Sequence, residues 1–89
     1  MLFRSKVSSE KAQAIAVVSG SSDVSIRELF LGALQAFSVK IVDVQEILMA
    51  HRVILAIHFT LDPAHAPAID KDLKAVADKE GLDQALEIL

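Results

Sequence analysis

The side chains that could perform catalysis lie far apart in this sequence of 89 residues. Its histidines are His51, His58 and His65. His51 and His58 are separated by an odd number of residues, which on a regular strand places them on opposite faces. No group of His, Asp and Glu has the spacing of a metal site, and there is no cysteine to supply thiolate ligands. We therefore expect no metal ion, no cofactor and no catalytic residue in this chain.

Two short motifs look catalytic but lack a necessary feature. Asp70-Lys71-Asp72 resembles the paired aspartates of phosphotransferases, yet it falls inside a predicted helix, whereas the productive pair lies at the end of a strand. Ser19-Gly20-Ser21-Ser22 lacks the lysine and the second glycine of a phosphate-binding loop. No serine lies in the G-x-S-x-G pattern of a nucleophile elbow. The chain is therefore not expected to be an enzyme by itself.

One segment is suited to ligand binding, the loop Gly20–Ser25 between a predicted strand and a predicted helix. The start of a helix offers backbone N–H groups without partners and the positive end of the helix dipole. The backbone N–H groups of the loop residues Gly20, Ser22, Asp23 and Ser25 could therefore bind a carboxylate or another small anion. An ordinary capped turn without a ligand is the alternative.

A strand and a helix position this loop. Ala14–Val18 is short and apolar and is followed by turn-forming residues, which predicts a strand. The clearest helical pattern follows the loop. Ser25-Ile26-Arg27-Glu28 has the form of a capping box at its start. Apolar residues then recur with the spacing of one helix face, at Ile26, Leu29, Phe30, Ala33, Leu34 and Phe37.

The remaining elements complete a recognisable order. Val39–Met49 and Val53–Leu61 are rich in β-branched residues and are joined by a short link, which predicts an antiparallel hairpin. A helix beginning near Pro67 and ending at Gly81 is followed by a last strand, Leu82–Leu89. The order βαββαβ predicts an α+β, ferredoxin-like sandwich, with two helices on one face of a four-stranded antiparallel sheet.

The other face of such a sheet would be open. It should carry Ile54, Ala56, His58 and Thr60, and 53% of the chain is hydrophobic. We therefore expect a homodimer or contact with a second domain. The net charge of −3 without a basic cluster argues against a nucleic-acid partner. No segment has the length of a membrane span or the pattern of a signal peptide, which favours a cytoplasmic location.

Four segments carry a resemblance to a known family. They are Val17-Val18-Ser19-Gly20, Ser38-Val39-Lys40-Ile41-Val42-Asp43-Val44-Gln45-Glu46, His51-Arg52-Val53-Ile54-Leu55 and Gly81-Leu82-Asp83. With the order of elements, they resemble the N-terminal ACT domain of bacterial phosphoserine phosphatases, especially the long actinobacterial kind. The resemblance covers residues 14–89, and the Ser, Lys and Glu content of residues 1–13 predicts a flexible arm.

The resemblance implies a regulatory and association domain of serine biosynthesis. Its ligand would be a small amino acid, with L-serine as the candidate, bound at an interface with a second copy or a second ACT domain. Hydrolysis with Mg²⁺ would belong to a separate catalytic domain outside this chain. The alternative is a structural ACT-like dimerisation module that has lost its ligand.

The family's loop is matched only in part. Its first glycine corresponds to Gly20, its aspartate is displaced by one position to Asp23, and its proline and second glycine are replaced by Val24 and Ser25. Asp43 occupies the position of an asparagine that holds the amino acid in the family. The resemblance implies that Asp43 of a neighbouring domain would bind the ligand's ammonium group.

Overall fold

The computed structural model describes residues 11–89, in which four strands form one antiparallel sheet. These strands are β1 (Ala12–Ser21), β2 (Lys40–Met49), β3 (Arg52–Leu61) and β4 (Asp83–Ile88). They are arranged in the order β2-β3-β1-β4, so that β1 and β3 are central. The predicted ferredoxin-like α+β fold is confirmed.

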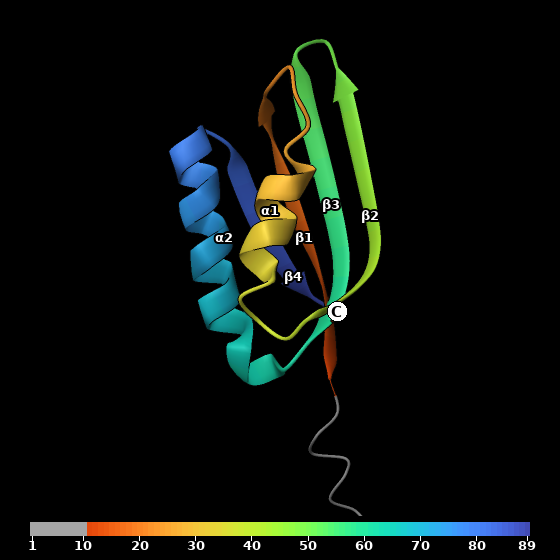
Figure 1. The fold of residues 1–89 in the computed structure, drawn as a ribbon, viewed down its shortest axis with the longest axis vertical. Coiled ribbons are helices and arrows are strands. Elements are labelled where there is room, and N and C mark those ends of the chain that lie inside the picture. The colour runs from red at the N-terminus through yellow and green to blue at the C-terminus, as the bar shows by residue number, and fades with distance from the viewer. Residues whose placement is uncertain (1–10) are drawn as a thin grey trace, which may run out of the picture.

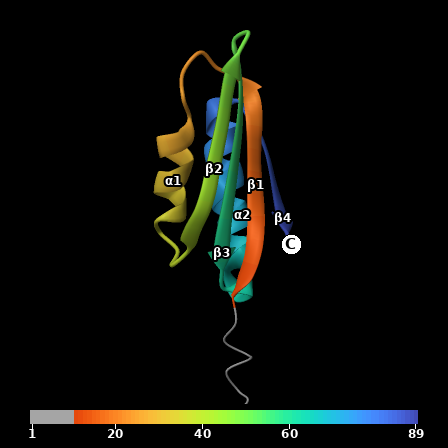
Figure 2. The ribbon, with the colours of Figure 1, turned by 90° about the vertical axis from the view of Figure 1, so that its right-hand side faces the viewer.

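Two helices lie on one face of the sheet (Figure 1). Helix α1 (Arg27–Leu34) connects β1 to β2, and α2 (Ala66–Glu80) connects β3 to β4 after the short 3-10 helix η2 (Pro63–His65). In the orthogonal view α1 stands beside the β2 edge (Figure 2). Gly81 ends α2 in the left-handed conformation, with φ of 73°, as its position predicted. Within residues 11–89 no helix is long and apolar enough to cross a membrane.

The core lies between the sheet and the helices. Alternate residues of β3 point toward the helices and are fully buried, while Ile54 between them is 48% exposed on the other face. Burying each large apolar side chain stabilises the fold by roughly 1.5–3 kcal/mol. The largest buried side chains are Phe30, Phe59, Leu34, Leu55, Ile57, Leu61, Ile69, Leu73, Val18 and Val53.

Strand β1 is longer than the short apolar run in the sequence indicated. It begins at Ala12 and ends at Ser21, because β3 offers it a partner at every position from Leu61 to Arg52. It also pairs with β4, and the Leu89 N–H donates to the Gln13 carbonyl over 2.8 Å. Residues 12 and 13 therefore belong to the sheet, while the rest of the expected N-terminal arm, up to residue 10, lies outside the described residues.

Helix α1 differs from its prediction at both ends. Ile26 is the residue before the helix and its own side chain makes no capping hydrogen bond. Of the expected capping box, Ser25 contributes through its Oγ, which accepts from the Arg27 N–H over 3.2 Å. The helix ends at Leu34, so Phe37 lies beyond it, although Phe37 still packs against the core. Leu29, placed on the buried face by its spacing, is 42% exposed. An eight-residue helix contacts the sheet along a narrow stripe, which Ile26, Phe30 and Leu34 fill.

The β2–β3 hairpin turns at Ala50 and His51, as the short link predicted. Both residues have positive φ, 53° and 64° respectively. This conformation matches the twist of the two strands but is usually adopted by Asn-Gly or Asp-Gly. The turn is therefore strained at two residues that carry a Cβ atom.

Candidate ligand-binding site

The β1–α1 loop lies beside the β2–β3 hairpin turn, at one end of the sheet (Figure 1). The Ser22 N–H donates to the His51 carbonyl over 2.9 Å, and Asp23 Oδ1 lies 2.5 Å from His51 Nδ1. Ser22 Oγ also donates to the Val24 carbonyl over 2.7 Å. Of the predicted site residues, Ser22 and Asp23 thus fix the loop on the hairpin.

A cavity of about 150 Å³ opens between this loop and the end of α2. Its lining combines serine hydroxyls, one carboxylate and an apolar wall. The cavity is similar in volume to one that binds benzene in another protein, so it can contain a small ligand. It is lined by Ser21, Ser22, Val24, Ser25, Ile26, Leu29, Glu80 and Leu82.

Gly20, also predicted as a site residue, does not line this cavity but lies against one of its walls. A Cβ atom at Gly20 would lie 2.6 Å from Leu82 Cδ2 and 3.4 Å from Leu82 Cα. The absence of a side chain therefore lets Leu82, which is buried, approach the end of β1. Gly20 shapes the site indirectly, through Leu82.

Glu46 of β2 occupies the start of α1. Its carboxylate accepts a hydrogen bond of 2.6 Å from the Ser25 hydroxyl and one of 2.9 Å from the Ile26 N–H. The Arg27 guanidinium lies 3.7 Å away, and the Glu46 side chain is only 5% exposed. The strand alternation explains this position, because Glu46 pairs with buried Leu55 on the helix-facing side of the sheet.

The surroundings of Glu46 favour its ionised form. Burial alone would raise the pKa of this carboxyl group, but the hydrogen bonds from Ser25 and Ile26 and the charge of Arg27 together lower the pKa below its ordinary value. The carboxylate takes the place at the helix start where the sequence suggested an external anion. Glu46 therefore caps the helix start together with Ser25, and it occupies the place expected for a ligand carboxylate.

Sequence reasoning missed Glu46, although a signal was present. Val44, Glu46 and Leu48 alternate along β2 and share the helix-facing side. A single charged residue between two apolar ones on that side needs a partner in the helix layer. The N-terminal end of α1 supplies that partner.

Asp43 is not brought to the loop within this chain. It pairs with His58 on the open face of the sheet, and its carboxylate accepts hydrogen bonds from the Val44 N–H and the Gln45 amide. Along β3, His58 is six residues from Arg52, or about 20 Å. The predicted role of Asp43 requires a neighbouring domain and stays a prediction.

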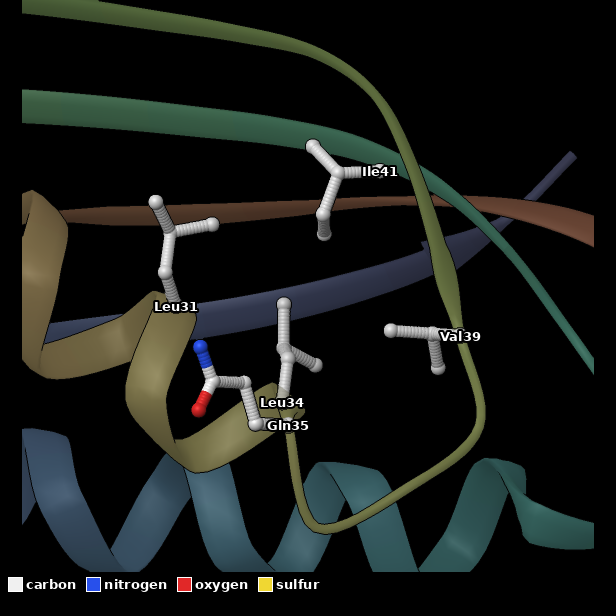
Figure 3. Close-up of a pocket in the computed structure, with 5 residues that line it drawn as sticks. All are labelled: Leu31, Leu34, Gln35, Val39 and Ile41. Carbon is white, nitrogen blue, oxygen red and sulfur yellow. The ribbon is translucent and has the colours of Figure 1, made fainter.

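A second cavity, of about 170 Å³, lies between the end of α1 and the start of β2. Figure 3 shows aliphatic side chains from both elements around it, with the amide of Gln35 as the polar group. No ionisable side chain lines it. Its lining is Leu31, Leu34, Gln35, Val39 and Ile41, and it offers no group for chemistry on a ligand.

The part of the chain that the structure describes contains no cluster of side chains that could bind a metal ion. Within residues 11–89, no three His, Asp or Glu side chains come close enough to hold a metal ion. Asp70 and Asp72 are exposed in α2, as predicted, and Asp70 accepts a hydrogen bond from Gln84. The paired aspartates therefore lie on the exposed surface of a helix and not at the end of a strand.

Comparison with solved structures identifies the fold. An ACT domain protein from Streptococcus pneumoniae matches with a TM-score of 0.76 and 12% identity, over 89% of this chain and 91% of that one. A putative glycine cleavage system transcriptional repressor matches with a TM-score of 0.79 and 10% identity, over 89% of this chain and 46% of that one. Formyltetrahydrofolate deformylase from Burkholderia mallei matches with a TM-score of 0.77 and 13% identity, over 86% and 28%.

These likenesses establish a ferredoxin-like α+β fold of the form found in ACT domain proteins. The chain spans less than half the length of the repressor and of the deformylase. No protein-family model and no curated protein matches the sequence.

Proposed function

We propose that this chain is an ACT-type regulatory domain that binds a small amino acid or a related compound and performs no catalysis itself. The observation that carries the proposal is the cavity of about 150 Å³ at the β1–α1 loop. It offers hydroxyl groups, a carboxylate and an apolar wall in a volume suited to a small ligand. The fold shared with an ACT domain protein supports the same reading.

The finer form of the proposal concerns the parent protein. We propose a phosphoserine phosphatase of serine biosynthesis in the cytoplasm, with L-serine as the effector. Four sequence segments support this link, among them Ser38–Glu46 and His51–Leu55. Phosphoserine hydrolysis and its Mg²⁺ would belong to a separate catalytic domain.

Association with a second copy or a second ACT domain is part of the proposal. The face of the sheet opposite the helices carries exposed apolar residues on three adjacent strands, including Val17, Ile47 and Ile54. Covering this face would remove apolar surface from water. In such an assembly, the partner's copy of Asp43 would complete the ligand site. The charge pattern favours neither a nucleic acid nor a membrane as partner.

A structural module without a ligand is the second candidate. The position of Glu46 favours it, because this carboxylate already bonds the Ile26 N–H at the start of α1. An amino acid could not place its carboxylate there without displacing Glu46. The two candidates differ in one measurable property, which is ligand binding at the cavity.

Titration of ¹⁵N-labelled protein with L-serine at millimolar concentrations tests the proposal. We expect changes in chemical shift that are confined to the backbone amides of the cavity lining, such as those of Ser21, Ser25 and Leu29. Val24→Trp should fill the cavity and abolish them, since Val24 lines it and is 67% exposed. Val42→Trp, at a position 52% exposed in β2, is the matched control and should leave them unchanged. The absence of shifts with L-serine, glycine and ethanolamine alike would leave the structural module as the function.

A further inference from the structure

The charges around the cavity at the β1–α1 loop are mainly negative. Glu80 lines the cavity directly and lies in the last turn of α2. The C-terminal end of a helix carries a partial negative charge, which adds to that of Glu80. Glu46 lies behind the wall that Ser25 and Ile26 form, and its carboxylate bonds both residues.

Two backbone donors at the start of α1 and the charge of Arg27 already have partners within the chain. The Ile26 N–H donates to Glu46, and the Arg27 N–H donates to Ser25 Oγ over 3.2 Å. The guanidinium of Arg27 lies 3.7 Å from the carboxylate of Glu46 and is paired with it. A carboxylate entering the cavity would therefore meet the negative charges of Glu80 and Glu46, and the Ile26 and Arg27 N–H groups are already bonded within the chain.

The arrangement is better suited to a positive charge. An ammonium group beside Glu80 would interact with a carboxylate and with the negative end of α2. The hydroxyl group of Ser21 in the lining can bond a hydroxyl of the same ligand, since it can donate and accept, whereas the Ser25 hydroxyl already donates to Glu46. The apolar wall, with Leu29 and Leu82, can contact a short hydrocarbon part.

We infer that this cavity recognises its ligand by an ammonium group at Glu80, and that it favours small hydroxylated amines over amino acids with a free carboxylate. The inference rests on the proposed function in taking the cavity as the ligand site. It differs in the class of ligand. The Glu46 carboxylate already bonds the start of α1, so that a carboxylate on the ligand is unfavourable there.

Three ligands of matched shape separate the two charges. L-serine carries an ammonium and a carboxylate, ethanolamine keeps the hydroxyl and the ammonium, and 3-hydroxypropanoate keeps the hydroxyl and the carboxylate. Calorimetry and amide shifts of the intact chain should give a Kd for ethanolamine at least about tenfold lower than that for L-serine. No binding of 3-hydroxypropanoate is expected.

Two variants assign the effect to the named carboxylates. Glu80→Gln keeps the shape of the side chain but removes its charge, and should abolish ethanolamine binding. Glu87→Gln, on the exposed face of β4, is the matched control and should leave it unchanged. Glu46→Gln retains an acceptor for the Ile26 N–H without the charge. It should therefore reduce the ratio between the Kd for L-serine and the Kd for ethanolamine.

The outcomes distinguish this inference from the proposed function. Tighter binding of ethanolamine that Glu80→Gln removes supports the inference. L-serine binding as well as or better than ethanolamine, or any binding of 3-hydroxypropanoate at the cavity, would overturn it while leaving the amino-acid proposal intact. Ethanolamine binding that persists in Glu80→Gln also overturns it. If none of the three ligands shifts the cavity amides, both the inference and the proposed ligand site are wrong.

Discussion

At the scale of single residues, the site depends on one carboxylate that belongs to the sheet. Glu46 connects β2 to the loop before α1 through Ser25 and Ile26. The Ser25 side chain is exposed in part, yet it is held by this contact and by the Arg27 N–H. A side chain 21 residues from Ser25 in sequence therefore supplies part of the cap that the sequence assigned to local residues.

The first prediction concerns the charge of Glu46. Glu46→Gln should lower the free energy of unfolding at neutral pH by about 1–3 kcal/mol, since the hydrogen bonds from Ser25 and Ile26 would then go to a neutral acceptor. The lowered pKa of Glu46 sets the pH dependence. Its contribution is present above the ordinary glutamate pKa and is lost as pH falls through the lowered value. The difference in unfolding free energy between wild type and variant should thus become smaller as the pH is lowered.

Denaturant titrations at neutral and acidic pH would measure this gap. Glu87→Gln on the open face is the control and should change stability by less than about 0.5 kcal/mol. A gap for Glu46→Gln that stays constant or grows toward acidic pH would contradict the assigned role of the carboxylate.

The second prediction compares two glycines. Gly20→Ala should destabilise the protein by about 1–3 kcal/mol, because its Cβ would lie 2.6 Å from Leu82 Cδ2. Gly32→Ala should stabilise it by about 0.5–1 kcal/mol, because Gly32 lies within α1 and a Cβ there meets no atom within 4 Å. Thermal unfolding of both variants should give shifts of opposite sign, and an unchanged or raised Tm for Gly20→Ala would refute the packing described for Gly20.

At the scale of elements, the hairpin turn is the part with the least favourable backbone conformation, with positive φ at Ala50 and His51. The strand pairing of β2 with β3 compensates for the turn, since it extends from Met49 and Arg52 to Lys40 and Thr60. The turn in turn supports the β1–α1 loop through His51. The strained turn therefore contacts the loop that lines the cavity, through Ser22 and Asp23.

The third prediction tests this strain. Ala50→Gly should raise stability by about 0.5–1 kcal/mol, because Ala50 has φ of 53° and glycine adopts that conformation without steric cost. The same substitution at Ala75, exposed in the middle of α2, should lower stability by about 0.5–1 kcal/mol. Chemical denaturation of the two variants provides the comparison. A loss of stability in Ala50→Gly would show that the turn is not strained.

Much of this element structure could be predicted because it follows local patterns. The alternation from Val53 to Leu61 identified β3 and its buried face, and Gly81 identified the end of α2. The contact between Gly20 and Leu82 could not be predicted, because it joins residues that only the finished sheet brings together. The same is true of Glu46, whose partners belong to another element.

At the scale of the whole molecule, the two layers leave the second face of the sheet uncovered. Helices α1 and α2 lie on the same side, and no element among residues 11–89 covers the other. On that uncovered face Ile54 lies between Ser19 and Ile47 of the neighbouring strands. Exposed apolar side chains on adjacent strands form a continuous surface that favours association.

The fourth prediction tests association through this face. Ile54→Lys should shift the protein toward monomer by at least about tenfold in the dimer dissociation constant, since a charge would be buried at the interface. Its effect on monomer stability should be small, because Ile54 is 48% exposed. Ala75→Lys, at an exposed position on the helix side of the molecule, is the control. Sedimentation of a wild-type monomer at high concentration would remove the claim of a homodimer.

The pairing of β1 with β4 also determines how this domain can be combined with others. Because the Leu89 N–H bonds the Gln13 carbonyl, the start of one strand and the end of the other lie at a single point on the surface. The domain could therefore be inserted into a loop of a host protein without moving the two ends of that loop apart. By the same geometry, a short linker from Leu89 to Ala12 should permit circular permutation, with new termini at an exposed turn such as Ala50-His51.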